Sequence, residues 1–273
     1  MKYNINNRFK GVIVVTVISE LLKKVKRIHF IGIGGSGMCP LAEILHSQGY
    51  ELSGSDNNES DTLARIRNLG IPVVVGQKAE NIKGAEMIVY TAAILKDNTE
   101  LIAAKNSGIP TFERAEMLGA ITDMFSNCIC VCGTHGKTTT SSMITQMLLE
   151  NGKDPSAVIG GKLPLINSSG RVGKNENMVC EACEFEDHFL KLYPDVAVIL
   201  NVDEDHLEYF KNLDNIIKSF HKFADMATKS VIYNGDDANT LKAVEGIDGK
   251  EMISFGLKNS NDYYAENIEM NHA

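Results

Sequence analysis

The chain has 273 residues, of which 44% are hydrophobic and 23% charged, and this composition is typical of a globular protein. Its formal net charge is −8 and it has no long run of lysine and arginine, which argues against binding to nucleic acid or to an anionic membrane surface. No apolar stretch approaches the roughly 20 residues that a membrane-spanning helix requires.

Residues 1–24 are predicted to be an extension that precedes the first domain. Lys2, Arg8 and Lys10 precede the apolar run 11–18, an arrangement that faintly resembles a signal peptide. The polar stretch 19–26 follows without a cleavage site of small residues. A secreted protein is therefore the weaker interpretation, and we expect a cytoplasmic protein.

Strand-like and helix-like segments alternate from residue 25 to residue 126, which predicts a first domain with parallel strands and covering helices. Strands are predicted at 27–33, 51–55 and 87–90. Helices are predicted at 36–48 and 61–69, and an amphipathic helix at 113–124 closes the domain.

A second series of strands and helices begins at Asn127, so we place the domain boundary near Ser126, with the second domain at 127–273. The apolar patterns predict strands at 128–132, 178–183 and 196–201, and helices at 138–150, 214–226 and 238–244. The stretch 165–177 is rich in turn-forming residues and is predicted to be a surface loop.

Five of the six cysteines form two groups in the second domain. Cys128, Cys130 and Cys132 alternate along an apolar run, and Cys180 and Cys183 form a CxxC pattern. Neither group has the turn-rich setting of a zinc knuckle. We therefore predict reduced cysteines that pack in the core, which fits a cytoplasmic protein.

A first glycine-rich loop, GIGGSG, joins the first predicted strand to the first predicted helix. Glycines let the backbone turn tightly and approach a pyrophosphate at the helix N-terminus. An acidic residue at the end of the second strand suits a ribose hydroxyl. The spacing favours a dinucleotide or a nucleotide diphosphate without distinguishing NAD from a UDP-sugar. The candidate residues are Gly32, Gly34, Gly35, Ser36, Gly37 and Asp56.

A second loop, GTHGKTTT, follows the strand predicted at 128–132 and precedes a helix. It keeps the GKT core of a phosphate-binding loop, although Val131 stands where the usual first glycine would be. Backbone N–H groups wrap the phosphates in such loops, the lysine neutralises the β- and γ-oxygens, and a threonine hydroxyl reaches Mg²⁺. The candidate ATP-binding residues are Gly133, Thr134, His135, Gly136, Lys137, Thr138 and Thr139.

The two loops together are more informative than either alone. An NAD-dependent oxidoreductase would account for the first loop only, and a simple ATPase for the second only. The predicted fold is α/β, with a Rossmann-like parallel-sheet domain at 25–126 followed by a P-loop ATPase-type α/β domain. The combination suggests an enzyme that spends ATP on a substrate carrying a diphosphate.

With both loops in place, the chain resembles the Mur ligase family, most closely the branch that joins L-alanine to UDP-N-acetylmuramate. The matching stretches run from Ile28 to about Asp237. They include HFIGIGGSGM, TAAI, ERAEML, GTHGKTT, EACE and NVDEDHLEYF.

The resemblance implies an ATP-dependent carboxylate–amine ligase of peptidoglycan precursor synthesis, which acts through an acyl phosphate. Its partners would be UDP-N-acetylmuramate, L-alanine, ATP and Mg²⁺, with no nucleic acid and no membrane. Lys137, Glu181 and His206 would be catalytic, and Thr138, Glu181 and His206 would hold the metal. Arg114 is a further candidate for substrate contact, although a helix-start arginine can equally face solvent.

Two alternatives stay open. One is a ligase that attaches a recycled murein tripeptide to the same acceptor, and the other is a non-catalytic module that binds a UDP-sugar. The resemblance also implies a third domain with the amino-acid site, and a His/Asn motif that packs against adenine near the end of the second, central domain. This sequence contains neither, so we expect the central domain to be incomplete and the 273 residues alone to be inactive.

Overall fold

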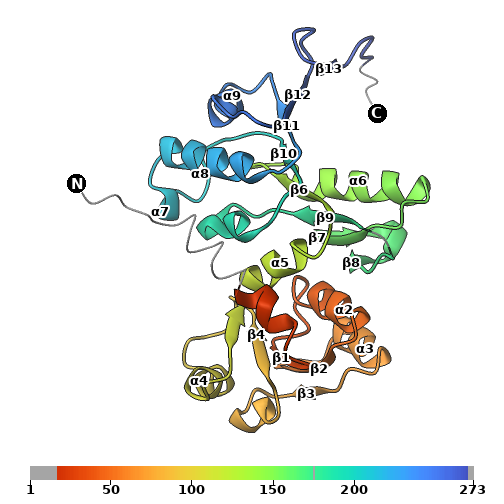
Figure 1. Cartoon of the computed structure of the whole chain (residues 1–273), viewed down its shortest axis with the longest axis vertical. Coiled ribbons are helices and arrows are strands. Elements are labelled where there is room, and N and C mark those ends of the chain that lie inside the picture. Colours follow the sequence, from red (N-terminus) through yellow and green to blue (C-terminus); the bar gives the residue numbers. More distant parts are fainter. Residues whose placement is uncertain (1–16, 175, 270–273) are drawn as a thin grey trace.

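The computed structural model describes residues 17–174 and 176–269, which form two sheets flanked by helices (Figure 1). The first sheet lies in the lower half of Figure 1 and the second in the upper half, with helix α5 between them. Among the described residues, none of the helices combines the length and the apolar character that a membrane crossing requires.

The first sheet has five parallel strands in the order β3-β2-β1-β4-β5. The strands are β1 (Arg27–Ile31), β2 (Glu51–Asp56), β3 (Val73–Val75), β4 (Met87–Tyr90) and β5 (Thr111–Glu113). The helices are α2 (Cys39–Ser47), α3 (Asp61–Asn68), α4 (Thr99–Asn106), α5 (Arg114–Thr122) and the 3₁₀ helix η1 (Ala79–Ile82). The strand order reverses at β1, so the carboxyl end of β1 is the point where such sheets bind ligands.

The second sheet has eight strands in the order β13-β12-β11-β10-β6-β9-β7-β8, all parallel to their neighbours except β8. The strands are β6 (Asn127–Cys132), β7 (Ser156–Leu163), β8 (Ser168–Arg171), β9 (Asn177–Glu181), β10 (Val196–Ile199), β11 (Ser230–Asn234), β12 (Glu251–Gly256) and β13 (Tyr263–Tyr264). The helices are α6 (Lys137–Glu150), α7 (Leu207–Phe210), α8 (Leu213–Met226), α9 (Ala238–Val244), and the 3₁₀ helices η2 (Pro164–Ile166) and η3 (Phe185–Lys191).

The prediction of a surface loop at 165–177 is wrong, because this stretch contains β8, which pairs antiparallel with β7. Close packing explains two of its glycines, because Gly170 lies against α2 of the first domain and Gly173 lies against residues 154–156 of the second. A Cβ atom at Gly170 would lie only 2.4 Å from Cβ of Pro40. The glycines of this stretch therefore reflect close packing, which at Gly170 joins the two domains.

Helix α5 also differs from its predicted character, because it is not amphipathic. Seven of its nine residues are buried, including Met117, Leu118 and Ile121. The reason is its position between the two sheets, where it contacts η3 of the second domain. A helix that is covered on both sides has no wide solvent-facing surface, so it lacks the polar face of an amphipathic helix.

One hydrophobic core includes residues from both domains. Residues 17–22, within the predicted N-terminal extension, are helical, and Ile18 and Leu22 are buried in this core. The remainder of the predicted extension, with Lys2, Arg8 and Lys10, lies outside the described residues.

The six cysteines are free thiols. The predicted core position is confirmed for Cys128, Cys130, Cys132 and Cys180, whereas Cys183 is partly exposed. Burial raises the pKa of the Cys132 thiol well above its ordinary value, so this thiol stays protonated and unreactive.

Candidate functional site

The first glycine-rich loop lies at the carboxyl end of β1. Gly32 has a left-handed backbone (φ +81°), and the N–H groups of Gly32 and Ile33 donate to the Ser55 carbonyl at 2.8 and 3.0 Å. Asp56 Oδ2 accepts from the Gly34 N–H at 2.9 Å. The Asp56 carboxylate therefore fixes the path of the loop. Its other oxygen, Oδ1, accepts from the backbone N–H groups of Asn57 and Asn58.

Two donors of this loop are free. Among the described residues, the N–H groups of Ser36 and Gly37 have no hydrogen-bond acceptor. Arg114, the first residue of α5, lies against Gly37, where an added Cβ atom would be 3.1 Å from its Nη1. The structure thus places Arg114 beside the loop, and two free N–H groups with a guanidinium suit a diphosphate.

The second domain also reaches this loop. The Ser169 hydroxyl of β8 donates to the Ser36 carbonyl at 3.0 Å. No spacing of residues predicts this contact, because Ser169 lies in a stretch that is predicted to be a surface loop. The run of small residues Ser168, Ser169 and Gly170 is a local sequence feature that permits such a close approach.

The second loop joins β6 to α6. Gly136 has a left-handed backbone (φ +84°), and α6 begins at Lys137. The first N–H groups of a helix have no acceptor inside the helix, so the first turn of α6 presents free donors. Asn201, which follows β10, anchors this loop through two hydrogen bonds to His135. It accepts the His135 N–H at 2.8 Å and donates to the His135 carbonyl at 3.0 Å.

Lys137 is turned back onto its own loop. Its Nζ donates to the carbonyls of Gly133 (2.6 Å) and Thr134 (3.2 Å) and to Glu184 Oε1 (2.8 Å). Glu184 is almost fully buried, at 2% exposure, and its Oε2 has no hydrogen-bond partner within residues 17–174 and 176–269. Sequence reasoning missed Glu184, although it lies in the EACE motif, three residues after Glu181.

Glu181 and Thr138 meet at a pair of glycines in β7. Glu181 Oε2 accepts from the Gly160 N–H at 2.7 Å, and a Cβ atom at Gly160 would lie 2.3 Å from Oε1. A Cβ atom at Gly161 would lie 2.9 Å from Cγ2 of Thr138. The glycine pair thus leaves room for both candidate metal ligands beside the phosphate loop.

His206 belongs to a different group from Glu181 in this structure. It has a left-handed backbone (φ +51°), and its ring packs on Phe185 with centroids 4.7 Å apart. The ligand atoms of His206, Asp205 and Glu184 all lie within 4.8 Å of one another. Carboxylate oxygens suit Mg²⁺, and the unpartnered Oε2 of Glu184 is an oxygen that a cation would satisfy. Asp205 was also missed, although it adjoins His206 in sequence.

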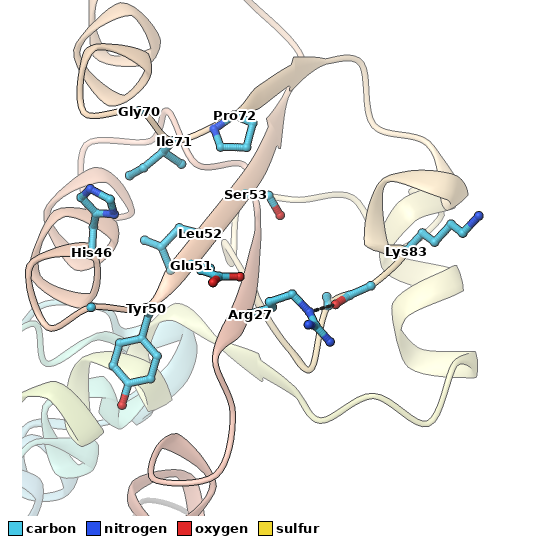
Figure 2. Close-up of a pocket in the computed structure, with 13 residues that line it drawn as sticks. Arg27, His46, Tyr50, Glu51, Leu52, Ser53, Gly70, Ile71, Pro72 and Lys83 are labelled. Atoms are coloured by element: carbon cyan, nitrogen blue, oxygen red, sulfur yellow. Dashed lines mark hydrogen bonds between the residues drawn. The ribbon is translucent and has the colours of Figure 1, made fainter.

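A cavity of about 570 Å³ opens at the opposite, amino-terminal edge of the first sheet (Figure 2). Arg27, Tyr50, Ser53 and Lys83 are among its lining residues, and none of the predicted site residues is. The Arg27 guanidinium is already paired with the Gly84 carbonyl and with Glu86. The candidate site is therefore the carboxyl edge of the two sheets and not this cavity.

Comparisons with known proteins agree with the two-domain arrangement. The sequence profile described as the Mur ligase family, catalytic domain, matches residues 27–126, and that of the Mur ligase middle domain matches residues 131–273. The UDP-N-acetylmuramate–L-alanine ligase of Caldanaerobacter subterraneus subsp. tengcongensis is 45% identical over 249 residues. That of Clostridium tetani is 44% identical over 251 residues. These matches cover 90% and 91% of the chain, which spans only 54% and 55% of the two relatives.

Two solved structures are also similar. One is a UDP-N-acetylmuramate–alanine ligase from Thermotoga maritima, with a TM-score of 0.74 and 30% identity, matched over 85% of this chain and 53% of that one. The other is a UDP-N-acetylmuramate:L-alanyl-gamma-D-glutamyl-meso-diaminopimelate ligase from Neisseria meningitides. Its TM-score is 0.75 and its identity 27%, over 85% of this chain and 78% of that one.

Proposed function

Because the chain belongs to the Mur ligase family, we propose that it forms the UDP-substrate domain and the ATP-binding domain of an enzyme that joins L-alanine to UDP-N-acetylmuramate. The observation that carries this proposal is the presence of two phosphate-type loops, each at the carboxyl edge of its own sheet. Ser169 links the second domain to the first loop through the Ser36 carbonyl.

The choice of L-alanine over a recycled tripeptide rests on the relatives. Eight proteins named as L-alanine ligases are 42–45% identical to the chain. Among solved structures, the chain is 30% identical to the alanine ligase from Thermotoga maritima and 27% identical to the tripeptide ligase from Neisseria meningitides. The higher identity favours the amino-acid substrate.

In the proposed reaction, a carboxylate oxygen of the muramic acid attacks the γ-phosphorus of ATP, and the bond to the bridging oxygen of ADP breaks. The amine of alanine then attacks the acyl carbon, and phosphate leaves. Two anions must approach in the first step, and the Lys137 ammonium offsets their repulsion. The free N–H groups at the start of α6 would hold the phosphates in place.

A divalent cation would add positive charge at the same phosphates, where it acts as a Lewis acid. Thr138 and Glu181 beside the β7 glycines form one candidate set of ligands for Mg²⁺. Glu184, Asp205 and His206 form a second. The proposed enzyme works in the cytoplasm with ATP, and the free state of the six cysteines supports that compartment.

Calorimetric titration of the 273-residue chain tests the proposal. We expect UDP-N-acetylmuramate to bind and NAD not to bind. Asp56→Ala should abolish binding of the UDP-sugar and spare ATP, because Asp56 fixes only the first loop. Lys137→Ala should do the reverse. Binding of NAD without binding of the UDP-sugar would contradict the proposal and favour an oxidoreductase.

The expectation that these 273 residues do not ligate on their own stays a prediction. Phosphate release would be measured with both substrates, in the presence and absence of L-alanine. We expect no alanine-dependent release, because the amine must be held within attack distance of the acyl phosphate and the family places that site in a further domain. A robust alanine-dependent release would contradict this expectation.

A further inference from the structure

The ammonium group of Lys137 has no free donor in this structure. A lysine has three N–H donors, and those of Lys137 meet three acceptors, which are the carbonyls of Gly133 and Thr134 and the carboxylate of Glu184. A phosphate group that enters the loop must therefore displace at least one of them. Glu184 is the acceptor that a phosphate displaces, because the two anions repel each other and the two carbonyls belong to the loop itself.

Displacement would leave Glu184 in an unfavourable state. The residue is 2% exposed, its Oε2 already lacks a partner in the part of the chain that the structure describes, and its Oε1 would lose Lys137. An unpaired buried carboxylate is strongly destabilising unless a new cation compensates it. Asp205 and His206 supply two further ligand atoms within 4.8 Å.

We propose that Glu184 exchanges partners when a nucleotide binds. It pairs with Lys137 in the nucleotide-free protein, and it pairs with a divalent cation, together with Asp205 and His206, once phosphates occupy the loop. Nucleotide and cation then favour each other's binding, because the phosphates release Glu184 for the cation and the cation releases Lys137 for the phosphates. This inference rests on the proposed function only in taking ATP as the nucleotide.

The first experiment uses Mn²⁺ alone, without nucleotide, and measures its Kd from the electron paramagnetic resonance signal of the free ion at about pH 8. Lys137→Met frees Glu184, so Mn²⁺ should bind about tenfold more tightly, within the usual range for such coupling. In a Glu184→Gln background the same change should alter the Kd by less than about twofold. The matched control is Glu186→Gln, which removes a nearby exposed carboxylate and should leave the tenfold gain intact.

A second experiment measures ATP binding by calorimetry in the presence of EDTA. Glu184→Gln should tighten binding about tenfold, because Lys137 no longer has a competing carboxylate partner, and Glu186→Gln should not change it. This test does not depend on how well the Lys137 variant folds. Neither experiment involves the UDP-sugar, so failure of the exchange can be distinguished from failure of the proposed UDP-sugar binding.

Three results would overturn the exchange. One is a Lys137→Met protein whose Mn²⁺ affinity is unchanged. Another is a gain of equal size in the Glu184→Gln background, which would show a general effect of charge. The third is metal-free ATP binding that is unchanged or weaker in Glu184→Gln.

Discussion

The lack of a side chain at Gly160 has a direct role in the site. The Glu181 carboxylate occupies the space that a side chain at Gly160 would need. Its φ is not in the left-handed region, so alanine fits its backbone. Gly160→Ala should push Glu181 away and break the 2.7 Å hydrogen bond. We expect the free energy of unfolding to fall by about 1 kcal/mol and Mg²⁺-dependent ATP binding to weaken about tenfold.

Urea unfolding and calorimetry with and without Mg²⁺ would measure both effects. The control is the same substitution in a Glu181→Ala background, where the carboxylate is already absent and Gly160→Ala should have little effect. Equal losses in the two backgrounds would show that Gly160 acts through its backbone and not through Glu181.

His188 is a residue whose protonation opposes folding. It lies at the contact between the domains, with Nε2 3.4 Å from Glu113 Oε1. Burial lowers the pKa of His188 below its ordinary value of 6.5, and Glu113 only partly opposes the shift. The unfolded chain therefore binds a proton more readily than the folded protein, so the free energy of unfolding should decline as the pH falls below about 6.5.

Urea unfolding at about pH 7.5 and about pH 5.5 would test this expectation. His188→Gln removes the titrating group, so its free energy of unfolding should fall less between the two pH values than that of the unsubstituted protein. Parallel declines in both proteins would assign the effect to other groups.

Helix α3 carries two arginines whose ion pairs differ in burial. Arg65 pairs with Glu43 through two contacts of 2.5 and 2.7 Å, and Glu43 is 5% exposed. Arg67 pairs with Glu59 through contacts of 2.7 and 3.0 Å, but Glu59 is 63% exposed. Burial raises the pKa of Glu43, and Arg65 opposes that shift.

Arg65→Met should therefore lower the free energy of unfolding by about 2–3 kcal/mol, because it leaves Glu43 buried without its cation. Arg67→Met, two residues away on the same helix, should cost less than about 1 kcal/mol. Urea unfolding of the two variants gives the comparison, and equal costs would contradict the role assigned to burial.

The elements that the sequence predicted best are those with strong local signals. Helix α9 has its predicted bounds of 238–244, and the Asp237 side chain caps it by accepting from the Thr240 N–H. Strands β7 and β8 were not predicted, because their glycines follow from contacts with Glu181, Thr138 and Pro40 rather than from local strand preference. Strands β3, β5, β11, β12 and β13 were also not predicted.

The candidate site also divides into parts with a local signal in the sequence and parts that depend on distant contacts. Both glycine-rich loops were predictable, because their functional atoms come from consecutive residues. Glu184 reaches Lys137 across 47 residues of sequence, Asn201 reaches His135 across 66, and Ser169 reaches Ser36 across 133. Such pairs have no spacing that a single sequence reveals, and only the folded chain brings them together.

At the scale of the whole molecule, the two sheets share one hydrophobic core. Phe30, Met117 and Leu118 of the first domain belong to the same buried cluster as Phe189 and Phe223 of the second. We expect the chain to unfold in a single cooperative transition, with calorimetric and van't Hoff enthalpies that agree. Two resolved heat-absorption peaks in differential scanning calorimetry would show instead that the domains unfold independently.

The contact between β8 and the first domain also bears on aggregation. Unpaired strand edges recruit other chains, and within the described residues β8 and β13 are the outermost strands of the second sheet. The packing of Gly170 on Pro40 shields β8, whereas Tyr263 and Tyr264 on β13 are 70% and 44% exposed. Self-association of this chain should therefore start at β13. Tyr263→Lys should suppress it in light-scattering measurements while both phosphate loops stay untouched.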